Sequence, residues 1–544
     1  MSHRVLVVGL DGWDHGHEER LRAEGELPNL AALSGRSARF LIDTQGKQLD
    51  GLDWEHFLAG GGLEATHRSC AVDFDPSDYA AWQRSAGVAP FIKDLPVRSV
   101  IFDVPYLDLA RTPSTRGVVG WAGSDFGMDE PQARPDTLTR WIQSNVGTYP
   151  ATAWLDTVAW PSVEQSVAMG RHLVDGIETR REAARRLLTE RMPDWDLAMV
   201  VVTETHTAAE AFWHGVDASH PLNDHPSARP SAAALRDVYR ATDQLIGALI
   251  ECTGAEHVVV LALNGMASNR FDVPSMVLLP ELLTRWSCGQ QFLTVPPAWT
   301  ASPGDVPLLA ATGPSWTDAC DGWLGRSAPT SGRPGRLLHR IRNRIAPRPS
   351  RPDRHGSHTS PHEDRISLAW HPAMHYQSLW PQMRAFALPS FAAGHVRINL
   401  QGRERDGIVE PSDYGPVCDE VVELLCACTN PATGRSVVKS VARASETNPH
   451  GLDRADPDLR VVWDEAVCAF AHPDHGLIGP VPFRRTGDHM GTGGFVNFAG
   501  PDIAAGDRGV GTVFDLAPTI AGLTGEKSSA ALPGRDLLAN AEPA

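Results

Sequence analysis

Residues 4–12 read Arg-Val-Leu-Val-Val-Gly-Leu-Asp-Gly, and this stretch gives the clearest indication of the fold. From Val5 to Leu10 the residues are apolar or glycine, without alternation with polar ones, which is typical of a strand that is buried on both faces of a sheet. The run ends directly in Asp11 and Gly12. Ligands of parallel sheets bind at the carboxyl ends of the strands, so Asp11 is the first candidate for a functional residue.

Two later segments repeat this pattern. Residues from Ala198 to Thr203 and from His257 to Leu263 are again almost entirely apolar, and between them residues 232–250 carry apolar side chains at helical spacing. A helix is also expected over residues 18–33, interrupted near Pro28. Buried strands that alternate with helices predict an α/β fold with a central, mostly parallel sheet between helix layers.

Composition narrows the class of protein. The chain has 544 residues, of which 42 % are hydrophobic and 21 % charged, so we expect a normal buried core. Its net charge of −17 disfavours a nucleic-acid partner, which would need basic surface. The eight cysteines lack zinc-ribbon spacing and are interpreted as buried free thiols, and no apolar run reaches the length of a membrane helix. These features predict a cytoplasmic protein without a membrane partner.

One segment breaks the alternation of strands and helices. Residues 286–364 are rich in proline and, toward their end, in arginine. We therefore expect a core formed by residues 1–285 and 365–544, with 286–364 as an inserted cap or lid. The arginine-rich part is either a solvated loop or a lid that attracts anions, because guanidinium groups suit phosphate and sulfate.

Four groups of short motifs follow one another along the chain. They are Val7-Val8-Gly9-Leu10-Asp11-Gly12 with Leu27-Pro28-Asn29-Leu30; Thr203-Glu204-Thr205-His206 with Phe212-Trp213-His214 and Asp217; Ile398-Asn399-Leu400-Gln401-Gly402-Arg403-Glu404 with Gly407-Ile408-Val409-Glu410-Pro411 and Asp456-Pro457-Asp458-Leu459; and Gly487-Asp488-His489 with Phe514-Asp515-Leu516-Ala517-Pro518-Thr519-Ile520. In this order and spacing the chain resembles the alkaline phosphatase superfamily, in particular its type I phosphodiesterase and nucleotide pyrophosphatase branch.

The resemblance implies an alkaline-phosphatase-like sheet with a two-metal site at its strand ends. In that family, two divalent cations hold the phosphoryl oxygens, and a threonine or serine alkoxide is the nucleophile. Asp11 and His489 match the first and last metal ligands of the pattern. A gapless alignment through Trp54 and Phe57-Leu58-Ala59-Gly60 places Asp50 where the threonine should be.

The remaining ligand positions are changed. The Asp that should follow Thr203-Glu204-Thr205 is His206, and the His four residues later is Glu210. The family's Ser-Asp-His-Gly is Ala262-Leu263-Asn264-Gly265, and a leucine side chain cannot bind a cation. These replacements argue against a normal two-metal hydrolase.

The changed residues still have ligand chemistry. His206, Glu210 and His489 form a set of two imidazoles and one carboxylate, which suits one divalent ion of the zinc or manganese type. Asp11, Asp50 and Asn264 offer only oxygen, which suits a weakly held hard cation or none. Alternatively, His206 and Glu210 form an acid–base pair without metal, and Asp50 acts as a nucleophile or base. We also expect His214 and Asp488, which stand in the same motifs, to contact substrate.

The sequence leaves three functional hypotheses. The first is a diverged enzyme of this family that transfers or cleaves a phosphate-, phosphonate- or sulfate-type group of a small anionic molecule in a specialised biosynthetic pathway. The second is a non-catalytic binding or regulatory descendant. The third is an ordinary metal-dependent phosphodiesterase with Thr44 as its nucleophile, against which the loss of the ligand at Leu263 counts.

Overall fold

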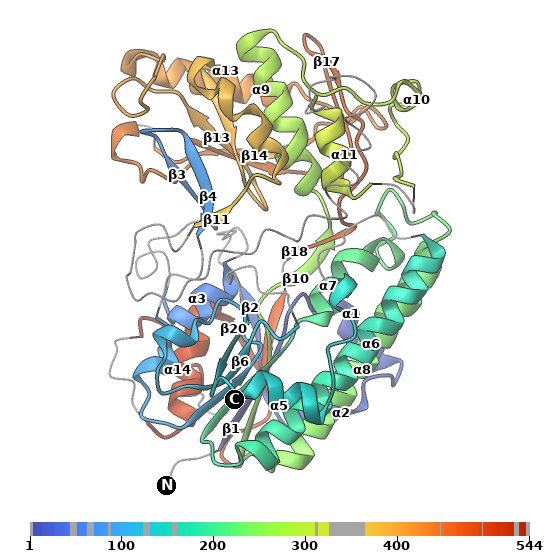
Figure 1. Cartoon of the computed structure of the whole chain (residues 1–544), viewed down its shortest axis with the longest axis vertical. Helices are drawn as coiled ribbons and strands as arrows, with labels where there is room; N and C mark the ends of the chain where they lie inside the picture. The colour runs from blue at the N-terminus through green and yellow to red at the C-terminus, as the bar shows by residue number, and fades with distance from the viewer. Residues whose placement is uncertain are drawn as a thin grey trace.

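The structure, a computed structural model, describes residues 4–43, 52–61, 70–84, 89–122, 131–154, 162–310, 314–325, 365–445, 448–491, 493–526 and 532–539. A large sheet with its helices forms one end of the molecule, and smaller sheets with further helices form the other (Figure 1). The short pair of strands β10 and β18 lies between the two ends.

The large sheet has nine strands. In spatial order they are β20 Gly506–Thr512, β2 Ala38–Asp43, β19 Gly494–Ala499, β9 His257–Ala262, β1 Val5–Leu10, β8 Leu197–Val202, β5 Ser99–Phe102, β6 Arg116–Val119 and β7 Gln132–Arg134. Neighbours run parallel except that β19 is antiparallel to β2 and β9, and β7 to β6. The three strands expected from the sequence are β1, β8 and β9, which lie side by side at the centre.

Helices cover both faces of this sheet, as the lack of alternation in its central strands requires. In β1, Leu6 and Val8 face one hydrophobic core, whereas Val5 and Val7 face another. The first core is closed by α1 His15–Ala23, α2 Pro28–Ser34, α5 Leu138–Asn145, α6 Val163–Arg186 and α8 Ala228–Thr253, and the second by α3 Asp53–Ala59 and α14 Val513–Leu523. The expected fold class, a mostly parallel sheet between helix layers, is confirmed.

The smaller sheets have a core of their own. The elements of this part are β3 Val72–Asp75, β4 Ala80–Arg84, β11 Arg365–Ser367, β12 Ala385–Leu388, β13 Gly394–Ile398, β14 Val438–Arg443, β15 Leu459–Trp463, β16 Phe470–His472, β17 Gly476–Ile478, α9 Leu279–Cys288, α10 Pro297–Thr300, α11 Trp316–Trp323 and α13 Tyr414–Cys426. The indole of Trp316, inside the expected insert, packs in this core and donates to the carbonyl of Pro482 at 2.8 Å. The division at residues 286–364 stays a prediction, and 326–364 lie outside the described residues.

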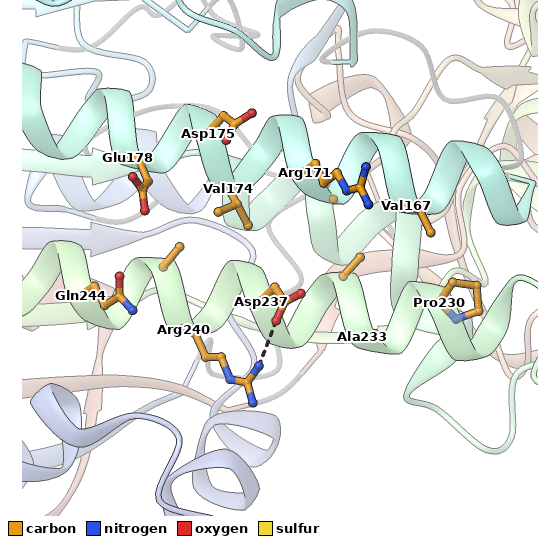
Figure 2. Close-up of a pocket in the computed structure, with 13 residues that line it drawn as sticks. Val167, Arg171, Val174, Asp175, Glu178, Pro230, Ala233, Asp237, Arg240 and Gln244 are labelled. Carbon is orange, nitrogen blue, oxygen red and sulfur yellow. Dashed lines mark hydrogen bonds and ion pairs between the residues drawn. The ribbon is translucent and has the colours of Figure 1, made fainter.

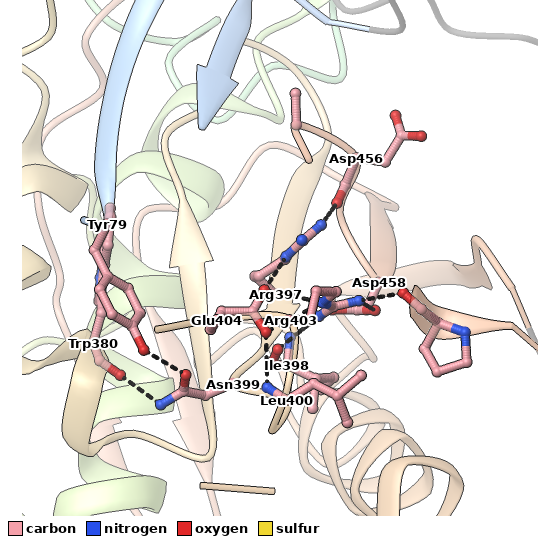
Figure 3. A network of polar contacts seen from close by, with 12 residues as sticks. Tyr79, Trp380, Arg397, Ile398, Asn399, Leu400, Arg403, Glu404, Asp456 and Asp458 are labelled. Atoms are coloured by element: carbon pink, nitrogen blue, oxygen red, sulfur yellow. Dashed lines mark hydrogen bonds and ion pairs between the residues drawn. The ribbon is translucent and has the colours of Figure 1, made fainter. Parts of the chain in front are cut away.

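The third sequence motif holds this smaller part together (Figure 3). Arg397 donates to Glu404 at 2.8 Å, and Arg403 donates to Asp458 at 2.7 Å. Asn399 accepts from the Tyr79 hydroxyl at 2.8 Å. Arg397, Glu404 and Asp458 are almost fully buried, and buried charges require such partners. The motif therefore stabilises the fold.

Three further observations complete the fold. All eight cysteines are free, but Cys426 is exposed and Cys252 and Cys288 are only partly buried, so the expectation of buried thiols was wrong for these three. They lie near the ends of helices, where one face meets solvent. No helix within the described ranges is long and apolar enough to cross a membrane.

Candidate functional site

Residues far apart in sequence meet at the carboxyl ends of the central strands. Asp11 follows β1, His206 lies in α7 (Glu204–Phe212) after β8, and Asn264 follows β9. They share a cavity of about 100 Å³. Its walls are formed by Asp11, Asp53, Trp54, Ala71, Gln83, Pro105, Tyr106, His206, Asn264, Trp370, Phe391, Arg484, Arg485 and His489.

The backbone explains why β1 and α7 bring their side chains so close. Gly12 has φ +62°, and a Cβ at this position would lie 2.5 Å from the Cα of His206. Only glycine combines this left-handed conformation with such a close approach. The hydroxyl of Thr205 lies 2.8 Å from the carbonyl oxygen of Val202 and also contacts that of Asp11, so its one proton is shared between carbonyls at the ends of both strands.

His206 is held between two carboxylates. Its Nδ1 lies 2.9 Å from Oδ2 of Asp11, and its Nε2 lies 2.8 Å from Oε1 of Glu210. The residues after Thr205 are helical, so Glu210 is one turn further along the same face of α7. The indole of Trp54 donates to the other oxygen of Asp11 at 3.0 Å. Burial alone would raise the pKa of Asp11, but the charge and hydrogen bond of His206, with the bond from Trp54, hold it below its ordinary value.

His489 completes the group from the other side of the cavity. It lies on β18 (Gly487–Gly491), and its ring centroid is 4.8 Å from that of His206. Its Nδ1 is 3.6 Å from Oε1 of Glu210. Burial lowers the pKa of His489 to about 4, so its imidazole is neutral at physiological pH and keeps a lone pair for a ligand.

Arg485 is a site residue that the sequence motifs do not mark. Its guanidinium donates to Asp272 at 2.8 and 3.0 Å, and also to Oε1 of Glu210. Burial lowers the pKa of Arg485 to about 10, which leaves the side chain charged at neutral pH. The neighbouring Arg484 donates to Asp272 at 3.2 Å and lies over the ring of Trp370. The only signal in the sequence is that two arginines shortly precede His489.

Asp53 is a second residue that sequence reasoning missed. It lies at the start of α3, is 6 % exposed, and accepts a hydrogen bond from the Asn264 amide at 3.0 Å. Burial raises its pKa to about 6. The alignment through Trp54 indicates Asp50 as the functional residue, although Asp53 is adjacent to that tryptophan. Asp50 and Thr44 lie outside the described residues, so their expected roles stay predictions.

The two expected substrate contacts do not line the cavity. His214 is fully buried, with Nδ1 3.2 Å from the hydroxyl of Thr486 and Nε2 3.0 Å from that of Ser227. Asp488 is 4 % exposed and accepts from the backbone of Arg270 at 3.3 Å. Both residues are buried and hydrogen-bonded beside the cavity, and their contact with substrate stays a prediction.

The residues fit one metal ion better than two. Among the described residues, His206, Glu210 and His489 offer three ligand atoms that lie within 4.8 Å of one another. Asp11 contacts Nδ1 of His206, the ring nitrogen that does not face Glu210. In metal sites, a carboxylate at this position often orients the metal-binding histidine. At the position of one expected ligand of a second ion, the described residue is Leu263, which is packed in the core and offers no ligand atom, and the neighbouring Asn264 donates a hydrogen bond from its amide nitrogen to Asp53.

A larger hollow, of about 580 Å³, lies on the outer surface of α6 and α8 (Figure 2). Its walls carry Arg171, Asp175 and Glu178 from α6 and Asp237 and Arg240 from α8, and none of its described lining residues is histidine or cysteine. Asp237 and Arg240 pair with each other at 2.9 Å, one helical turn apart. These are ordinary surface charges, so the strand-end cavity is the better candidate for chemistry.

Comparison with known proteins gives a likeness of fold. No protein-family model and no curated protein sequence matches the chain. Solved structures of a phosphonoacetate hydrolase from Sinorhizobium meliloti 1021, in complex with phosphonoformate or phosphonoacetate, are 12 % identical over 96 % of both chains, with a TM-score of 0.48. Human ectonucleotide pyrophosphatase/phosphodiesterase 5 is 9 % identical over 97 % of this chain and 96 % of its own, with a TM-score of 0.45.

Both of these proteins belong to the alkaline phosphatase superfamily, which the sequence motifs resemble. The identities and TM-scores are low. What this chain does is therefore argued from its own residues.

Proposed function

We propose that the protein is an enzyme that cleaves or transfers a phosphate-, phosphonate- or sulfate-type group of a small organic anion in the strand-end cavity. The observation that carries this proposal is the contact of His206 with both Asp11 and Glu210, beside His489. Such a cluster of buried acid, base and ligand groups at the ends of parallel strands is expected at a catalytic site.

The walls of the cavity favour an organic anion. Arg484 and Arg485 carry positive charge, and guanidinium groups bind tetrahedral oxyanions through paired hydrogen bonds. Trp370 and Phe391 contribute a stacked aromatic wall, with ring centroids 6.1 Å apart and planes 22° apart. An anionic group beside the arginines would thus place its organic substituent against aromatic rings.

One divalent ion would be held by His206, Glu210 and His489, and would polarise the anionic group and neutralise charge that develops on its oxygens. Asp11 fixes the ring of His206 through Nδ1. The amide of Asn264 holds Asp53 at the cavity wall, where its carboxyl group can accept a proton from an attacking water. In a metal-free protein, the same contacts would let His206 pass a proton between Asp11 and Glu210.

A covalent step through a serine, threonine or cysteine is not supported by the described residues of the cavity. Of the described residues that line it, none is serine, threonine or cysteine. Asp53 and Asp11 are the carboxylates among them, and Asp11 is already bonded to His206 and Trp54. We therefore assign Asp53 the role of base and expect direct attack by water or by an acceptor group.

The test is a panel of phosphate monoesters, phosphonates and sulfate esters with aryl and alkyl substituents. Release of phosphate, sulfate or alcohol is measured with and without zinc or manganese. We expect turnover of at least one chemical class, lowered roughly 100-fold or more in His206→Ala, since a lost acid–base group typically has that effect. His172→Ala, on the outer helix α6, is the matched control. Tight binding of these anions without any turnover would instead identify a binding protein.

A further inference from the structure

We propose that Arg485 is a built-in counter-cation of the site, which holds Glu210 in place when no metal is bound and competes with a divalent ion for the same carboxylate oxygen. This inference rests on the proposed function in taking His206, Glu210 and His489 as the working group. Its readout is metal affinity, which can be measured whether or not a substrate is ever found.

The competition follows from the contacts of one atom. Oε1 of Glu210 lies 2.8 Å from Nε2 of His206 and 3.6 Å from Nδ1 of His489, and it also accepts from the Nη1 of Arg485. A metal ion between the two histidines would use this oxygen. Guanidinium and metal would then be two cations on one buried atom, where their repulsion is only weakly screened.

The position of Arg485 is built into the fold. Its guanidinium donates two hydrogen bonds, of 2.8 and 3.0 Å, to Asp272, which is only 2 % exposed. The backbone next to it is also tied to Glu210, because the amide of Thr486 donates to the Glu210 carbonyl at 2.8 Å. Arg485 therefore cannot move away from Glu210 as a free surface arginine could, and metal binding has to break or bend its contact with Oε1.

Arg484 provides a matched control. It is adjacent in sequence, carries the same charge and bonds to the same Asp272, but its guanidinium extends over Trp370. If charge at Glu210 is what matters, neutralising Arg485 should change metal affinity much more than neutralising Arg484. If metal affinity depended only on the total positive charge of the cavity, neutralising Arg484 and neutralising Arg485 would change it equally.

The experiment titrates zinc and manganese into the metal-free full-length chain by calorimetry. We expect Arg485→Gln to bind at least ten-fold more tightly than the wild type, and Arg485→Lys, which keeps the charge, to stay within about three-fold of it. Arg484→Gln should also stay within about three-fold. Circular dichroism and thermal unfolding verify that each variant is folded.

Removing the charge of Arg485 leaves the buried carboxylates of Asp272 and Glu210 with one cation fewer, which lowers the stability of the fold. The double variant Arg485→Gln/Asp272→Asn removes the ion pair as a unit and should show the same tighter binding. Equal or weaker binding in the neutral variants overturns the proposal, as does an equal gain in Arg485→Lys or Arg484→Gln. Absence of binding in every variant also overturns it, because removing the guanidinium would then have freed no site.

Discussion

At the scale of single residues, the site is a row of ionisable side chains in which each contacts the next. Asp272 binds Arg485, Arg485 binds Glu210, Glu210 contacts His206, and His206 contacts Asp11. Each member is nearly or partly buried, and each offsets the desolvation of the next. Removing one member would take one polar partner from each of its neighbours, so we expect the effects of substitutions along this row to be coupled.

Asp53 gives a residue-scale prediction about pH. Its pKa is raised by burial from 3.8 to about 6, so the folded state binds this proton more tightly than the unfolded state. Its contribution to stability is therefore fully present below about pH 4 and is lost as pH rises toward 6. Two pKa units correspond to about 3 kcal/mol, which is the upper limit of the loss.

We expect Asp53→Asn, which cannot ionise, to escape this loss. Denaturant unfolding should show the variant about 1–3 kcal/mol more stable, relative to the wild type, at pH 7.5 than at pH 4. Asp175→Asn, at an exposed position on α6, is the control. Parallel pH profiles for wild type and Asp53→Asn would show that Asp53 is not held in a desolvated position.

At the scale of elements, the site depends on how closely β1 approaches the start of α7. Gly12 permits this approach, and β18 is brought against the other end of α7 by the backbone bond between Thr486 and Glu210. The cavity is completed by Trp370 and Phe391, which lie in loops of the smaller part and pack against its core. The geometry of His206 is therefore set by three elements and not by α7 alone.

We predict that Gly12→Ala displaces α7 and disrupts the site. The new Cβ would lie 2.5 Å from the His206 Cα at a φ of +62°, and we expect a loss of stability of about 1–3 kcal/mol together with loss of metal binding. The control is Gly254→Ala, where φ is +55° but nothing lies within 4 Å of the added Cβ. That variant should lose some stability yet bind metal normally. Normal metal binding by Gly12→Ala would contradict the role of this contact.

Several parts of the site could be predicted from sequence because they follow local rules. An acidic residue after a buried strand locates Asp11, and the spacing of four residues places His206 and Glu210 on one face of a helix. Arg485 and Asp53 escaped prediction because their importance comes from partners far away in sequence, Asp272 and Asn264. His214 and Asp488 stand in the same motifs, but they are buried, contact Thr486 and Arg270, and are not among the described residues that line the cavity.

At the scale of the whole molecule, the three central strands β1, β8 and β9 were predictable from their apolar runs, whereas the independent core of the smaller sheets was not. Its antiparallel strands are short, and β14 has no buried position, so they give weak sequence signals. The motif around Arg403 belongs to that core, where Arg403 pairs with the buried Asp458.

The whole arrangement predicts little ordinary phosphodiesterase activity. Among the described residues, Leu263 is packed in the core, so one expected ligand of a second metal ion is missing. Turnover of bis(4-nitrophenyl) phosphate with added zinc or manganese should therefore stay close to background, since each lost catalytic group costs several kcal/mol of the barrier. Robust turnover that is abolished in Thr44→Ala would instead identify an ordinary hydrolase of this family.

The central claim is that His206, Glu210 and His489 form one site for one divalent ion, in place of a two-metal centre. Native mass spectrometry of the full-length chain at saturating zinc measures the number of bound ions directly. We predict one ion per chain in the wild type and in His172→Ala, and none in His206→Ala or His489→Ala. Two ions per chain, no ion in the wild type, or one ion that survives both substitutions would contradict the account.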